Sequence, residues 1–117
     1  MLTKNVITGS QQTGIAVWEN SSGTLIDKNV VSTTGGDGIQ VQAASSGTKL
    51  LKNEAYGNGG DGIEVATTSA TLTKNLAVGN GQLGINALDG VTDGGGNVAA
   101  GNGDPRQCTG VVCAAPL

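Results

Sequence analysis

The chain has 117 residues and a net charge of −3, with 21 Gly, one Trp, one Tyr, and neither Phe nor His. At this length one modest domain is expected, and large aromatic rings cannot form its core. The lack of His excludes imidazole bases, His-bound zinc and Ser-His-Asp triads. The acidic balance argues against nucleic acid as a partner, and no apolar run approaches the roughly 20 residues that insert across a bilayer.

A repeat runs through most of the sequence. Its clearest marker is an Asn that follows Lys in four copies and Gly in the fifth: Asn5, Asn29, Asn53, Asn75 and Asn97. The steps between these positions are 24, 24, 22 and 22 residues. A Gly-Ile pair begins nine residues after each of the first four Asn. The change in period therefore falls in the polar segment that follows Gly-Ile-x-Val, which predicts a surface loop there.

Apolar residues recur at fixed places in each copy. These columns are Leu2, Ile26, Leu50 and Leu72; Ile7, Val31, Ala55, Ala77 and Ala99; Ile15, Ile39, Ile63 and Ile85; and Val17, Val41, Val65 and Ala87. The Ile-x-Val spacing is typical of a strand with one buried face, and no helical spacing is sustained, so each copy predicts several short strands. Like residues stack on like only if successive coils run parallel, about 4.7–4.9 Å apart, which predicts a right-handed solenoid.

The Asn column supports this interpretation, because stacked amides can hydrogen-bond from coil to coil. A second column, Asn58, Asn80 and Asn102, marks another corner. Gly96 stands before Asn97 where the other copies have Lys, which suggests that the bend tolerates a left-handed backbone.

The pattern Leu-x-Lys-Asn-x-Ala-x-Gly-Asn-Gly-Gly-Asp-Gly-Ile-x-Val, with a short Ser/Gly loop, resembles the right-handed parallel β-helix repeat of pectate-lyase-like and bacterial secreted proteins. The resemblance covers residues 1–103 and carries no specific activity. It implies an all-β, single-stranded coil with three short parallel sheets, the pectin lyase fold, in about four to five coils. It also implies an extracellular, periplasmic or cell-surface location.

The repeat stops at Asp104-Pro105, because Pro ends strand pairing, so residues 1–103 are expected to form the coils and 104–117 a tail. The tail holds Cys108 and Cys113, which predict either a small disulfide in an oxidising compartment or two reduced apolar side chains. The chain enters the repeat in mid-coil at Met1, so we also expect further coils upstream.

Two columns of residues point outward on the Gly-Ile strand. One holds Ala16, Gln40, Glu64 and Asn86, and the next holds Trp18, Gln42, Ala66 and Leu88. The resemblance makes this the face where carbohydrate-active β-helices bind substrate. An exposed indole at Trp18 can stack on a sugar ring, with Gln40, Gln42 and Glu64 as hydrogen-bonding neighbours, although Trp18 can equally cover a loop. The alternative of catalysis lacks residues: Glu64 has only the distant Glu19 as a carboxylate partner, and the sole Arg106 is in the tail.

Two further charged features have ordinary explanations. Asp37 and Asp61 occupy the same turn one coil apart and could share Ca²⁺, the only cofactor that the sequence suggests, but capping of the turn explains them as well. The lysines before the Asn column could attract an acidic glycan, or they could form a solvated edge.

Together these features predict a non-catalytic, secreted or surface-associated rod that contacts polysaccharide. The alternatives are the C-terminal portion of a polysaccharide lyase or glycoside hydrolase whose active coils lie upstream, and the stalk of a virion or cell-surface adhesin.

Overall fold

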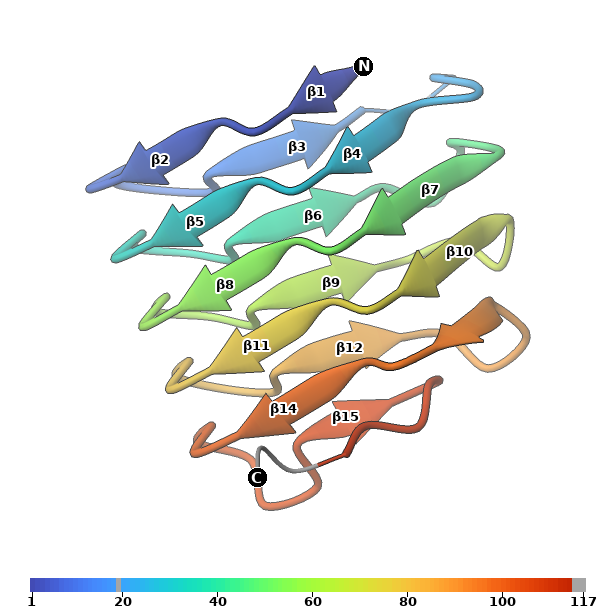
Figure 1. Ribbon diagram of the computed structural model, residues 1–117. Helices are drawn as coiled ribbons and strands as arrows, with labels where there is room; N and C mark the ends of the chain where they lie inside the picture. The colour runs from blue at the N-terminus through green and yellow to red at the C-terminus, as the bar shows by residue number, and fades with distance from the viewer. Residues whose placement is uncertain (19, 115–117) are drawn as a thin grey trace.

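The computed structural model describes residues 1–18 and 20–114, and within these the chain forms a parallel β-solenoid of five stacked coils (Figure 1). Sheet A contains β1 (Leu2–Thr3), β4 (Leu25–Asp27), β7 (Thr48–Leu51), β10 (Ala70–Thr73) and β13 (Thr92–Gly95). Sheet B contains β2 (Val6–Thr8), β5 (Val30–Ser32), β8 (Glu54–Tyr56), β11 (Leu76–Val78) and β14 (Val98–Ala100). Sheet C contains β3 (Ile15–Val17), β6 (Ile39–Val41), β9 (Ile63–Val65), β12 (Ile85–Ala87) and β15 (Cys108–Thr109).

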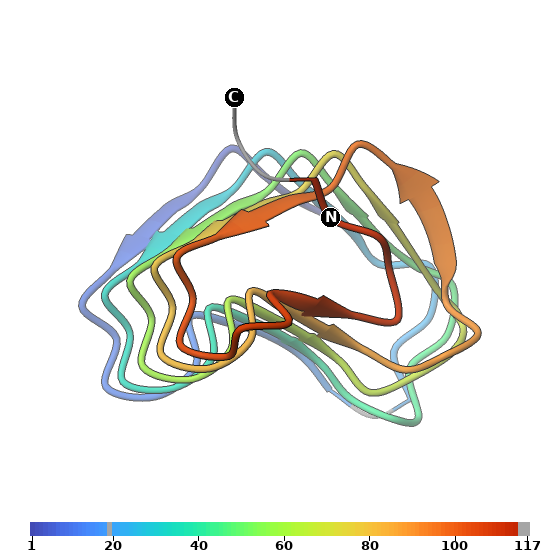
Figure 2. The same ribbon diagram turned by 90° about the horizontal axis from the view of Figure 1, so that it is seen from below.

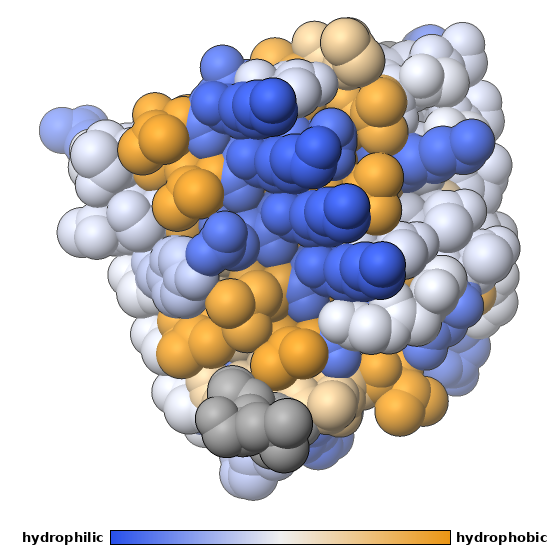
Figure 3. All heavy atoms as spheres, in the orientation of Figure 1, coloured by the Kyte–Doolittle hydropathy of each residue, from blue (hydrophilic) through white to orange (hydrophobic). Residues whose placement is uncertain are grey.

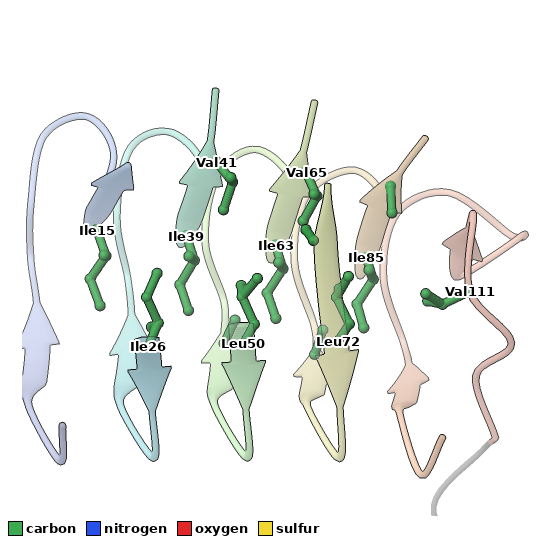
Figure 4. Close-up of a cluster of buried hydrophobic side chains, with 14 of the residues drawn as sticks. Ile15, Ile26, Ile39, Val41, Leu50, Ile63, Val65, Leu72, Ile85 and Val111 are labelled. Atoms are coloured by element: carbon green, nitrogen blue, oxygen red, sulfur yellow. The ribbon is translucent and has the colours of Figure 1, made fainter. Parts of the chain in front are cut away.

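The predicted register is confirmed for the buried columns of the first four coils, and a bulge shifts it between β10 and β13 of sheet A. Ile15 pairs with Ile39, Ile39 with Ile63 and Ile63 with Ile85, so the four isoleucines form one interior line. Ile26, Leu50 and Leu72 form the line that faces them (Figure 4). Seen along the axis, the coils nearly superimpose around this narrow interior (Figure 2). The small Ala55, Ala77 and Ala99 are buried in sheet B, which fits a core without large rings.

The first corner, between sheets A and B, is held by a ladder of asparagines. The backbone N–H and the side-chain amide of Asn29 both donate to Oδ1 of Asn53, at 3.0 and 3.1 Å. Asn53 in turn donates from its side chain to Oδ1 of Asn75 and to the carbonyl of Ile26, at 3.0 and 2.8 Å. The same bonds connect Asn75 to Asn97, where Oδ1 of Asp93 accepts the last amide. The side-chain amides of the buried ladder asparagines are thereby satisfied without water.

The second corner, between sheets B and C, repeats this arrangement. Asn58, Asn80 and Asn102 form the ladder, with Thr34 in the coil before Asn58 donating its N–H and its hydroxyl to Oδ1 of Asn58. At the other end Oε1 of Gln107 accepts the N–H and the side-chain amide of Asn102, at 3.0 and 2.8 Å. Gln107 therefore completes this ladder from the tail.

The tail corrects one expectation. Pro105 does not end the stack, because β15 pairs in parallel with β12 and supplies the fifth strand of sheet C. The chain recovers the strand direction after Pro105 because the carbonyl of Gln107 accepts the N–H groups of Gly84 and Ile85, which returns the backbone to the edge of β12. Cys108 and Cys113 form a disulfide, and Ala114 bridges to Val98 at the edge of sheet B.

Candidate functional site

The outer face of sheet C carries one hydrogen-bonding side chain per coil in four successive coils. Gln40 pairs with Glu64, Glu64 with Asn86 and Asn86 with Thr109, and all four are half-buried. The hydroxyl of Thr109 donates to Oδ1 of Asn86 at 3.2 Å. The row thus presents amide, carboxyl and hydroxyl groups at the spacing of parallel strands, on a backbone that the sheet holds rigid.

The neighbouring column places the indole of Trp18 beyond the end of β3. Trp18 is 68% exposed, and the next coil brings Gln42 alongside, where its N–H donates to the carbonyl of Val17. Gln42 is half-buried, while Leu88 at the far end of the column is exposed. An exposed ring therefore stands one coil before Gln42 in this column and two coils from Glu64.

A cluster of carboxyl groups lies at the edge of the row. Asp37 precedes β6, Asp61 precedes β9, and one carboxylate oxygen of each lies within 4.8 Å of the others and of a Glu64 carboxylate oxygen. Oδ1 of Asp37 accepts the N–H of Asp61 at 2.8 Å, and Oδ1 of Asp61 accepts the N–H of Leu83 at 2.9 Å. Oδ2 of Asp61 also accepts the side-chain amide of Asn86, at 3.1 Å. Each Asp therefore caps the turn of the following coil.

The cluster alters the titration of two of its members. Partial burial raises the pKa of Glu64 above its usual value, and the negative Asp37, which accepts a hydrogen bond from the protonated acid, raises it further. Burial also raises the pKa of Asp61, although hydrogen bonds from Asn86 and Leu83 oppose the shift. Burial and the neighbouring Asp37 carboxylate therefore favour a protonated Glu64 that donates a hydrogen bond to Asp37.

A shallow hollow of about 480 Å³ continues from this cluster towards the tail. Its lining includes Asp61, Gln82, Asn86, Asp104 and Arg106. The guanidinium of Arg106 pairs with Asp104 at 2.8 Å and remains largely exposed. The sequence placed Arg106 away from the coil face, but the structure brings it to the rim of this hollow.

The chemistry of the cluster favours hydrogen bonding over metal coordination. Ca²⁺ takes about six to eight oxygen ligands, whereas both carboxylate oxygens of Asp61 are already acceptors for N–H groups. The position of Asp37 and Asp61 thus matches the turn-capping alternative. What sequence reasoning missed is the approach of Glu64 to both, although Asp61-Gly-Ile-Glu64 places a turn carboxylate three residues before a strand carboxylate. Glu19, the other carboxylate considered for catalysis, lies outside the described residues.

Comparison with known families gives one finding. A family model described as the right-handed β-helix region matches residues 1–102. No curated protein and no solved structure matches the chain significantly. The described residues contain no helix that is long and apolar enough to cross a membrane.

Proposed function

The chain belongs to the right-handed β-helix family, and from this premise we propose that it is a non-catalytic, secreted or surface-associated scaffold that contacts carbohydrate through sheet C. The observation that carries the proposal is the in-register row of Gln40, Glu64, Asn86 and Thr109 with an exposed indole at its margin. The disulfide between Cys108 and Cys113 supports an oxidising compartment, because such bonds are rare in the cytosol.

Polysaccharides suit such a face for physical reasons. A sugar chain displays hydroxyl groups at regular intervals, and amide and carboxyl side chains can both donate to and accept from them. The strands fix the base of each side chain before binding, so less conformational entropy is lost on contact. The indole of Trp18 offers a flat apolar plate against which the C–H face of a pyranose can stack.

Binding to an array of neutral and acidic glycans tests the proposal. We expect Trp18→Ala to weaken the best glycan by roughly three- to tenfold, and Gln42→Ala to weaken it less. Val6→Ala is the matched control, because Val6 is a similarly exposed apolar residue, at 76%, on sheet B. If no glycan binds to the wild type, or if Val6→Ala weakens binding as much as Trp18→Ala, sheet C is not a carbohydrate surface.

A second candidate, glycoside hydrolysis, is favoured by the carboxyl cluster. Retaining glycosidases use carboxyl groups about 5–5.5 Å apart, one of them with a raised pKa, and the carboxylate oxygens of Glu64, Asp37 and Asp61 lie within 4.8 Å of one another. Release of reducing ends from pectin without formation of unsaturated sugar ends, abolished by Glu64→Gln in a folded protein, supports this candidate. If the wild type releases no reducing ends, the non-catalytic binding scaffold is retained. If it also binds no glycan, only the role of a structural stalk is retained.

A further inference from the structure

The two asparagine ladders differ in the residue that follows each asparagine. At the second corner Asn58, Asn80 and Asn102 are each followed by Gly, and these are the three Asn-Gly sequences of the chain. At the first corner the following residues all carry side chains: Val6, Val30, Glu54, Leu76 and Val98. They begin the strands of sheet B, and Figure 3 shows hydrophobic side chains on this face of the molecule. The two ladders therefore differ in chemical stability, because an asparagine amide is most labile before Gly.

The stacking of the coils imposes these glycines. A Cβ on Gly59 would lie 2.6 Å from the carbonyl oxygen of Gly35, closer than real Cβ atoms approach. A Cβ on Gly81 would meet the carbonyl oxygen of Gly59, and one on Gly103 that of Gly81, at still shorter distances. All three contacts are with the backbone of the preceding coil, so no side-chain movement could relieve them. The second corner is therefore built from Asn-Gly because no larger residue fits after the asparagine.

An Asn-Gly sequence loses ammonia spontaneously in a flexible chain. The backbone nitrogen of Gly attacks Cγ of Asn, a new C–N bond closes a succinimide ring, and the bond from Cγ to Nδ2 breaks. Nδ2 leaves as ammonia with the proton of the Gly nitrogen. Water then opens the ring at either carbonyl, which gives aspartate or isoaspartate, whose main chain runs through Cγ. Asn is thermolabile for this reason, and Gly accelerates the attack because it has no side chain to hinder it.

The folded corner holds the reacting groups apart at the first two of these sequences. The N–H of Gly59 donates to the carbonyl of Thr34 at 2.9 Å, and that of Gly81 donates to the carbonyl of Asn58 at 2.8 Å. The side-chain amides of Asn58 and Asn80 each donate at 2.9 Å to Oδ1 of the next ladder asparagine. Both asparagines are only 2% exposed. Ring closure at either one therefore requires the ladder itself to open.

Asn102 is bonded in the same way but is less well supported. The N–H of Gly103 donates to the carbonyl of Asn80 at 2.9 Å. The following coil, however, offers Asn102 the side chain of Gln107 in place of another asparagine, and both hydrogen bonds to Oε1 of Gln107 are only partly buried. Asn102 is 8% exposed, against 2% for Asn80. The opening that frees Asn102 is therefore smaller than the opening that frees the other two.

The position of Gln107 depends on the tail. Gln107 directly precedes Cys108, which forms the disulfide with Cys113 and begins β15. Its side chain has one other bond, from Nε2 to the carbonyl of Asp104 at 3.1 Å. The disulfide therefore stabilises the segment that protects Asn102 and has no direct contact with the ladder asparagines of earlier coils.

We propose that Asn102 is a deamidation site gated by this disulfide-closed tail, and that the reaction prevents the tail from closing again. Aspartate at this place lacks the amide that now donates to the carbonyl of Ala77 and to Oε1 of Gln107. Its negative charge is also poorly solvated at a site that is 8% exposed. Isoaspartate in addition lengthens the main chain by one carbon, which moves Gly103 out of register with Asn80. The change is one-way, because ammonia is lost to solvent.

Incubation of the full chain at neutral pH, followed by peptide mapping with mass spectrometry, tests the proposal. In urea, the three Asn-Gly sequences should react at equal rates. In the folded protein, Asn102 should react roughly tenfold faster than Asn58 or Asn80, or more, because a local opening is enough. Reduction of the disulfide by a dithiol should raise the rate at Asn102 further. The exposed Asn20, which precedes Ser21, is the internal reference, because its rate should not depend on the tail.

A variant with the disulfide intact tests the gate independently of reduction. Gln107→Ala should raise the rate at Asn102 roughly five- to thirtyfold, because it removes the acceptor of two hydrogen bonds. Gln107→Glu is the matched control, since it keeps the acceptor and should react like the wild type. Asn97 controls for sequence, because it ends the first ladder in the same coil but precedes Val98. Circular dichroism establishes that each sample is folded.

Three results would overturn the proposal. The first is that Asn102 in the folded wild type reacts no faster than Asn58 and Asn80. The second is that Gln107→Ala leaves the rate at Asn102 unchanged, or that reduction does so in a chain that remains folded, which means that the tail is not the gate. The third is that Asn97 reacts as fast as Asn102, which means that opening of the coil alone sets the rate whatever residue follows.

Discussion

The two asparagine corners meet the same geometric demand with different residues. Each places a residue with positive φ directly before a ladder amide, and each closes its ladder with an acceptor from the last coil, Asp93 at the first corner and Gln107 at the second. The positive-φ residue, however, is Lys in four of five coils at the first corner and Gly in four of five at the second. Hydrogen bonding thus determines the buried asparagine of each bend, whereas the residue before it differs between the two corners.

The ladder itself should be equivalent at the two corners, and its loss has the largest expected effect. Asn53 and Asn80 each accept two hydrogen bonds at Oδ1 and donate two from the side-chain amide. Asn53→Ala or Asn80→Ala leaves buried N–H and carbonyl groups without partners, so we expect each to lower the free energy of unfolding by about 3–5 kcal/mol. Urea denaturation measures both values.

Asn5→Ala is the control for this pair. The exposed side chain of Asn5 donates one hydrogen bond, to Asn29, and its removal should cost about 1 kcal/mol or less. Unequal losses for Asn53→Ala and Asn80→Ala, differing by more than about 2 kcal/mol, would contradict the equivalence of the corners, because single hydrogen bonds contribute less than that.

The end of the second ladder gives the next effect. Gln107→Ala removes the acceptor for two donors of Asn102 at a half-buried site, and we expect a loss of about 1–2 kcal/mol in the free energy of unfolding. Gln107→Glu keeps the acceptor and should remain close to the wild type at neutral pH. A Glu variant as unstable as the Ala variant would show that the Gln107 side chain acts mainly through its bond to the Asp104 carbonyl.

Exchanging the positive-φ residues tests the contrast directly. A Cβ at Gly57 meets no atom within 4 Å, so Gly57→Lys should lower stability only through its φ of 60°. The steric cost of about 1–2 kcal/mol is partly offset by the lower entropy of the unfolded Lys chain, which leaves a net loss near 1 kcal/mol. Lys52→Gly should raise stability by up to about 1 kcal/mol for the same reasons.

Thermal denaturation of both variants checks the signs of these stability changes. Gly57→Asn is the control, because Asn tolerates the left-handed backbone. A clear loss of stability for Lys52→Gly would mean that the lysine stem contributes packing that outweighs its backbone strain.

The sequence predicted the repeating parts of this molecule well, because a column of like residues defines register whatever the loops do. The isoleucine line, the alanines of sheet B and the left-handed bend at Gly96 are all confirmed. The ends were predicted less well. Thr34 enters the second ladder through a hydroxyl, and β15 follows Pro105, because single residues replace the repeat there by other hydrogen bonds.

The candidate site shows a similar division. The outward columns of sheet C follow from strand alternation, and the exposure of Trp18 agrees with its predicted place. The meeting of Glu64 with Asp37 and Asp61 depends on how turn side chains fold back over the next strand. Periodicity fixes where a residue stands on the backbone, but not the direction of a side chain at an irregular turn, so this cluster could not be derived from spacing alone.

The smallest expected effect distinguishes the two ladder ends by pH. The N–H of Val112 lowers the pKa of Asp93, with further bonds from Gly95 and Asn97, so the folded value lies below the unfolded value of about 3.9. Stability from Asp93 is therefore present above that pH and is lost as pH falls through the folded pKa. Asp93→Asn should cost less than about 1 kcal/mol at pH 7, because the side chain is exposed, and the difference from wild type should shrink towards pH 3 or so. The loss caused by Gln107→Ala should change little over the same range, because an amide does not titrate. If the stability losses caused by Asp93→Asn and by Gln107→Ala shrink together as pH falls, acid weakens the last coil as a whole, through groups other than Asp93.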